Sequence, residues 1–174
     1  MKDITTTLKL KPYLVQWLTH HFGEPVRFPP RSYENMLLVR LIEKQPNGWC
    51  SRSMGEPGYV QIIIPDNIRK RPEYFNYLGR NAQKVMASAI EDLFILQLWR
   101  ACCPLLLTRG TLNSGLNTWC ASNGISLDYR EGIRQRFYRM RAEYRRYGIN
   151  IGDKYRKTLS LPPQKMNNQE NEET

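Results

Sequence analysis

Cationic side chains repeat along one predicted helix near the end of the chain, between residues 128 and 147. At about 100° per residue, five residues of this helix fall within roughly 80° of arc. They are Arg130, Arg134, Tyr138, Arg141 and Arg145. Guanidinium groups in such a row suit contacts to phosphates and bidentate recognition of guanine edges. No acidic residue lies on this stripe, and the exposed arc adds Arg139 and Arg146, so the pattern predicts a nucleic-acid-binding surface.

The elements that must position this stripe are a second helix and a turn. Leu116, Trp119 and Cys120 give the segment 112–123 one apolar face, and Gly124 suits a left-handed helix end. Asp128 and Glu131 have the D-x-x-E spacing of a capping box for the next helix. Four further residues of that helix form a stripe that is expected to face the core. They are Ile133, Phe137, Met140 and Tyr144.

This pair of helices resembles the helix-turn-helix unit of DNA-binding proteins, with 112–124 as the supporting helix and 128–147 as the recognition helix. The resemblance implies double-stranded DNA as the partner, with Arg130 and Arg134 nearest the bases. The tight form of the unit would place a core residue at Arg130, whereas a turn one residue longer gives Tyr129 and Ile133 instead. The chain also resembles small basic proteins of phages and mobile elements, which implies a regulatory or accessory role, for example in transcription.

The charge of the chain favours the same partner. The 174 residues carry 26 Lys and Arg against 16 Asp and Glu, a formal net charge of +10. Residues 127–157 alone contribute a net +6, and such a density attracts polyanions. A basic face also suits an acidic protein surface, so the alternative is a protein–protein adaptor without a nucleic-acid role. The stretch 93–107 is interrupted by Arg100 and Pro104, and we expect no membrane span and no membrane partner.

The N-terminal part predicts a mixed lobe over residues 1–66. Alternation makes 4–11 a strand, helices follow over 12–22 and 32–44, and 59–64 is a second strand. Strand, helix and helix in this order resemble the ribbon-helix-helix family, which implies a homodimer whose paired strands enter the major groove. Thr5, Thr7, Lys9 and Lys11 would then point outward. The strand at 59–64 offers a competing partner within the chain.

A second basic block lies at 69–84, where cations alternate with aromatic residues as in platforms that stack single-stranded nucleic acid. If the last helix binds DNA, this block is a candidate neighbouring contact to phosphates. Its candidate phosphate-contacting residues are Lys70, Arg71 and Arg80. In the alternative interpretation Phe75 and Leu78 are core and the cations are merely solvated. We expect a helix or two over 72–99, with Leu93, Leu96 and Trp99 facing the core.

The sequence offers no pattern for catalysis, and we expect no enzyme, no cofactor and no metal. It has no H-E-x-x-H, Walker or G-x-G-x-x-G motif, and the adjacent His20 and His21 would point about 100° apart on a helix. The four cysteines make no C-x-x-C pair, which is typical of reduced thiols in a cytoplasmic protein. We predict an α+β, mainly helical fold with a helical nucleic-acid-binding lobe over 67–157 and a disordered polar tail over 158–174.

Overall fold

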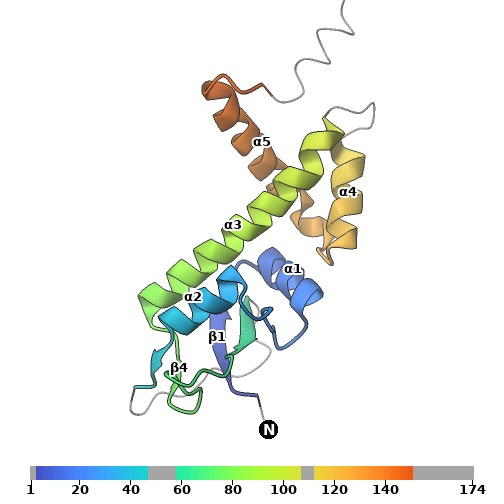
Figure 1. The fold of residues 1–174 in the computed structure, drawn as a ribbon. Helices are drawn as coiled ribbons and strands as arrows, with labels where there is room; N and C mark the ends of the chain where they lie inside the picture. Colours follow the sequence, from blue (N-terminus) through green and yellow to red (C-terminus); the bar gives the residue numbers. More distant parts are fainter. Residues whose placement is uncertain (1–2, 47–57, 107–111, 151–174) are drawn as a thin grey trace, which may run out of the picture.

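A computed structural model describes residues 3–46, 58–106 and 112–150 of the chain. The predicted tail at 158–174 and Cys50 lie outside the described residues. The fold is α+β and mainly helical, as predicted, with α3 running diagonally through the molecule (Figure 1). In chain order the elements are β1 (Thr5–Lys9), α1 (Pro12–Phe22), α2 (Tyr33–Leu41), β2 (Glu43–Lys44), β3 (Tyr59–Ile63), β4 (Phe75–Tyr77), α3 (Arg80–Leu105), α4 (Leu112–Ser122), the 3₁₀ turn η1 (Leu127–Tyr129) and α5 (Arg130–Arg146).

The first strand pairs within its own chain. β1 lies antiparallel to β3, with Thr5 opposite Ile63 and Lys9 opposite Tyr59. Alternation along β1 buries Leu8 and leaves Lys9 exposed, as the sequence predicts. β3 thus supplies the partner within the chain that competes with the two-chain ribbon, and the ribbon across a homodimer stays a prediction.

Local signals set the first two helices. Pro12 occupies the first turn of α1, where a missing N–H costs no hydrogen bond, and Gly23 ends the helix at φ +81°. Ser32 caps α2, since its Oγ accepts a hydrogen bond from the Asn35 backbone N–H at 3.1 Å. The predicted extension of α2 to residue 44 is wrong, because Ile42 adopts an extended conformation and the chain enters β2.

The predicted helix at 72–99 is also wrong at its start. Residues 75–77 form β4, which pairs with the two-residue strand β2, and α3 begins only at Arg80. The buried stripe of α3 repeats every four residues through Met86, Ile90, Phe94 and Leu98. Leu96, expected in the core, is 46% exposed. Leu93 and Trp99, which were also expected to face the core, are half-buried and pack against it.

One core holds the described elements together. Phe94 on α3 contacts Trp17 of α1 and Trp119 of α4, each with ring centroids 5.6 Å apart. The buried cluster runs without a break from Leu8 on β1 to Phe137 on α5. The core therefore crosses the boundary at residue 66 that the sequence suggested between two lobes. No helix among the described residues is long and apolar enough to cross a membrane.

Candidate nucleic-acid interface

The turn between α4 and α5 depends on a glycine. Gly124 has φ +68°, and a Cβ at this position would lie 2.7 Å from the His20 Nδ1. A side chain here would therefore be strained by the backbone and would also clash with α1. The neighbouring His21 fixes the same joint, where its Nε2–H donates to Asn123 Oδ1 at 2.9 Å. The turn thus holds the α4–α5 pair against α1.

The predicted capping box does not form. Ser126 Oγ accepts from the Asp128 backbone N–H at 3.3 Å and so caps η1, and α5 begins two residues after Asp128. The Glu131 carboxylate accepts from the Arg134 guanidinium and the Gln135 amide instead of reaching back to the backbone. The 3₁₀ turn lengthens the connection between α4 and α5, as the register with the longer turn requires. In that register Tyr129 and Ile133 face the core and Arg130 does not. Accordingly, Tyr129 is half-buried, Ile133 is buried and Arg130 is exposed.

The core-facing stripe of α5 is anchored on α3. Phe137 is fully buried and contacts Trp99, with ring centroids 5.5 Å apart. Tyr144 stacks on the same Trp99 ring, with centroids 4.6 Å apart, but it is 42% exposed and so does not lie in the core as expected. Arg136 adds an ion pair to Glu91 on α3. Lys11, just before α1, donates to the same Glu91 oxygen at 2.7 Å. These contacts fix the rotation of α5 about its axis.

The cationic stripe lies beside this anchored face, along the seam with α4. The Arg130 guanidinium donates to Asn117 Oδ1 at 3.2 Å, and Arg134 donates to Asn113 Oδ1 at 3.3 Å. Two arginines four residues apart on α5 thus meet two asparagines four residues apart on α4. Sequence reasoning missed both asparagines, although their spacing on one helix face was a readable signal.

The structure corrects the expectation that no acidic side chain neutralises the stripe. Glu131 forms an ion pair with Arg134 at 2.8 Å, and its pKa is lowered, chiefly by the hydrogen bond from Arg134. Outside the stripe, Glu143 pairs with Arg146 at 2.9 Å. Both pairs join residues three positions apart at the surface, where such pairs contribute little stability and exchange readily for other anions.

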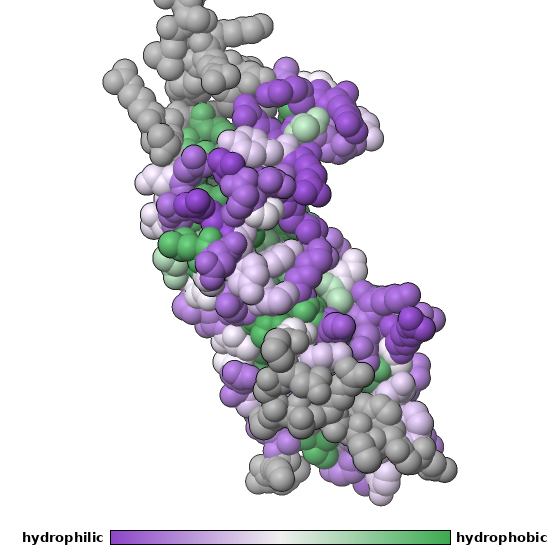
Figure 2. All heavy atoms as spheres, turned by 180° about the vertical axis from the view of Figure 1, so that it is seen from behind, coloured by the Kyte–Doolittle hydropathy of each residue, from purple (hydrophilic) through white to green (hydrophobic). Residues whose placement is uncertain are grey.

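The remaining predicted site residues of α5 reach solvent to different degrees. Tyr138 is 44% exposed, Arg139 and Arg145 are exposed, and Arg141 is half-buried. Altogether α5 carries seven arginines against two glutamates. Seen from behind, hydrophilic side chains gather where α5 lies, at the top right of the molecule (Figure 2). The helix therefore presents a strongly positive surface on a fixed scaffold.

The second basic block lies elsewhere. Lys70 donates its Nζ protons to the backbone oxygens of Arg40 and Ile42, at 2.9 and 2.8 Å, and so closes the end of α2. Arg71 and Arg80 are exposed. Arg80 opens α3 eleven residues before Glu91, which pairs with Arg136 of α5, a distance of about 16 Å along the helix axis. β4 and the start of α3 lie toward the opposite end of the molecule from α5 (Figure 1), so the block around them does not extend the surface of α5.

The described residues carry no arrangement for metal chemistry. Within 3–46, 58–106 and 112–150 no three His, Cys, Asp or Glu side chains gather into a metal site. Cys102 and Cys120 are buried as expected, and burial, with the neighbouring thiols, raises the pKa of Cys102 to about 12. Such a thiol stays protonated and unreactive near neutral pH.

Comparison of the chain with protein-family models, with curated proteins and with solved structures found no match.

Proposed function

We propose that this protein binds double-stranded DNA, with α5 as the recognition helix. The observation that carries the proposal is the row of arginines beside the core-facing stripe of α5. An isolated basic helix is common, but this one is fixed in rotation by Trp99 and Glu91 on α3. A rigid element positions charged groups with a smaller entropic cost at the moment of binding.

The two ends of the stripe have different roles in this proposal. Arg130 and Arg134 lie in the first turns of α5, the part of a recognition helix that meets base edges. Their hydrogen bonds to Asn117 and Asn113 hold both guanidinium groups at the α4 seam. Bidentate contact with guanine would require Arg134 to exchange its surface pair with Glu131 for the base. Arg141 and Arg145 lie toward the other end and contact phosphates. Tyr138 lies between these two pairs of arginines and packs along the sugar–phosphate backbone of the DNA.

The biological class follows from the sequence resemblance alone. A small basic chain of this kind fits a regulator or accessory factor of a phage or mobile element. In that role the protein reads a site and recruits or excludes other factors there, so the proposal includes sequence preference and no catalysis.

The experiment is a binding titration with a random pool of duplexes at several salt concentrations, followed by sequencing of the retained fraction. We expect log affinity to fall linearly with log salt, with a slope of about −0.9 for each phosphate contacted. We also expect one enriched motif. A steep slope without a motif would overturn the sequence preference. Capture of an acidic protein that survives nuclease treatment and excess duplex would instead favour the adaptor.

A further inference from the structure

The exposed side of α3 carries an apolar stripe that no other described residue covers completely. Val85, Ala89, Asp92 and Leu96 follow one another at the i, i+4, i+7 and i+11 spacing of one helix face. Val85 is 47% exposed and Leu96 46%. The face lies opposite the buried stripe that contains Phe94. Large apolar side chains gathered on one exposed helix face are typical of a surface that meets a partner.

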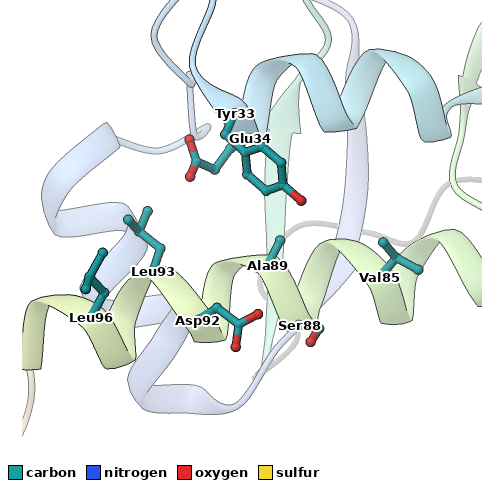
Figure 3. Close-up of a pocket in the computed structure, with 8 residues that line it drawn as sticks. All are labelled: Tyr33, Glu34, Val85, Ser88, Ala89, Asp92, Leu93 and Leu96. Atoms are coloured by element: carbon teal, nitrogen blue, oxygen red, sulfur yellow. The ribbon is translucent and has the colours of Figure 1, made fainter. Parts of the chain in front are cut away.

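The N-terminus of α2 turns this stripe into a groove. Figure 3 shows Tyr33 and Glu34 on α2 above the row of α3 side chains. The hollow has a volume of about 450 Å³, and Glu34 and Asp92 are its charged lining residues within the part of the chain that the structure describes. Among the described residues neither carboxylate makes an ion pair or a side-chain hydrogen bond. Two unpaired carboxylates beside apolar side chains, in a chain of net charge +10, suit a partner that is both apolar and basic.

The same chain exposes a surface of that chemistry where α5 ends. Tyr147 is 78% exposed and Ile149 50%, next to a shallow apolar hollow shared with Met140 and Tyr144. Arg146 lies directly before Tyr147, and its partner Glu143 holds it only by an exposed ion pair. We call these exposed residues, 146–149, the α5 end. They cannot reach the groove of their own chain, because Trp99 and Glu91 fix α5 on α3.

We propose that the groove between α2 and α3 binds the α5 end of a second copy of this chain. Pairing of two grooves with each other would bring four carboxylates together without a cation, so a symmetric contact through the groove is disfavoured. The contact is instead head-to-tail, and each bound copy leaves one groove and one α5 end open. Head-to-tail contacts that do not close into a ring grow into open assemblies. This self-association needs no DNA and stands apart from the proposed DNA binding.

The test is sedimentation velocity on the full chain without DNA, over a concentration series from about 10 μM to 1 mM, because small interfaces are weak. We expect species heavier than twice the 20.5 kDa chain mass at the upper end. Asp92→Lys places a cation in the groove, and Tyr147→Asp places a carboxylate on the α5 end. Each is expected to weaken association at least about tenfold. The matched controls Glu73→Lys and Tyr74→Asp change exposed residues outside both surfaces and should associate like the unaltered protein.

Mixing the two variants separates this geometry from pairing of like surfaces, groove with groove or α5 end with α5 end. Asp92→Lys keeps a working α5 end and Tyr147→Asp keeps a working groove, so their equimolar mixture should form dimers and nothing larger. Recovery of association in the mixture also shows that both variants are folded. A chain that stays monomeric at 1 mM, or a mixture that stays monomeric, overturns the proposal. Assembly of the unaltered protein that stops at a dimer overturns it as well, because a head-to-tail contact continues beyond two copies.

Discussion

Helices α3 and α5 meet at Trp99, and each buries one stripe of side chains while exposing another. On α5 the buried stripe contains Ile133 and Phe137, and the stripe beside it is cationic. On α3 the buried stripe contains Phe94 and Leu98, and the opposite stripe is apolar with a carboxylate. The buried stripes are alike and explain the fold. The second stripes differ, and that difference carries the two functional proposals. The cationic stripe of α5 is proposed to bind a polyanion, and the apolar stripe of α3 is proposed to bind a basic apolar surface.

The largest expected effect comes from breaking the buried stripe of α5. Phe137→Ala should lower the free energy of unfolding by about 3–5 kcal/mol, because the ring is fully buried against Trp99. Urea denaturation gives this value directly. The neighbouring Tyr138→Ala serves as the control, and its exposed ring should cost less than about 1 kcal/mol. Equal losses for the two variants would contradict the assigned rotation of α5.

The same comparison can be made on α3 with one substitution at two nearby positions. Leu98→Ala should cost about 2–5 kcal/mol, since Leu98 is fully buried. Leu96→Ala should cost less than about 1 kcal/mol, because its side chain already meets solvent. Thermal or urea unfolding of both proteins tests the pair. A large loss at Leu96 alone would place the core on the face that the groove is proposed to use.

A smaller effect is expected where the two helices are joined by charge. Burial of Glu91 raises its pKa, but the bonds and charges of Lys11 and Arg136 outweigh burial and hold the pKa below its usual range. The stability from this lowered pKa is present above the ordinary glutamate pKa and is lost as the pH falls through the lowered one. Glu91→Gln should therefore cost about 1–2 kcal/mol at neutral pH. The difference from the unaltered protein should shrink below about pH 4.

The adjacent carboxylate provides the control for this pH profile. Asp92→Asn removes a charge without a partner among the described residues and should leave stability unchanged at every pH. If unfolding measured between pH 3 and pH 7 shows the same curve for Glu91→Gln and the unaltered protein, Glu91 does not join α1, α3 and α5 as described.

Elements with local signals could be predicted from the sequence. Pro12 and Gly23 bound α1, Ser32 caps α2, and Gly124 turns the chain between α4 and α5, all as expected. Strands β2 and β4 were missed because they have two and three residues, too few for alternation to appear. Their pairing joins segments some thirty residues apart, and tertiary contact decides it. No local pattern encodes such a strand.

The face of α3 was assigned wrongly for a different reason. Its apolar residues lie on two sides, so periodicity alone cannot tell which side meets the core, and Leu96 was placed inside. The sequence pattern indicates which residues of α5 form the cationic stripe, but it does not indicate which residues of other helices contact α5. The contacts of Arg130 with Asn117 and of Arg136 with Glu91 depend on how separate helices cross.

The central claim is that the cationic stripe of α5 contacts DNA, and the most direct test is duplex affinity measured for three arginine variants of the full chain. Arg134→Ala should lose about 1–3 kcal/mol of binding free energy, roughly tenfold to a hundredfold, with relaxed sequence preference. Arg145→Ala should weaken all sequences alike and flatten the salt slope by about one unit. Arg27→Ala, which removes an exposed arginine paired with Asp3 far from α5 in the sequence, should bind nearly as the unaltered protein. If Arg134→Ala and Arg145→Ala both bind as tightly as the unaltered protein while remaining folded, α5 is not the recognition helix.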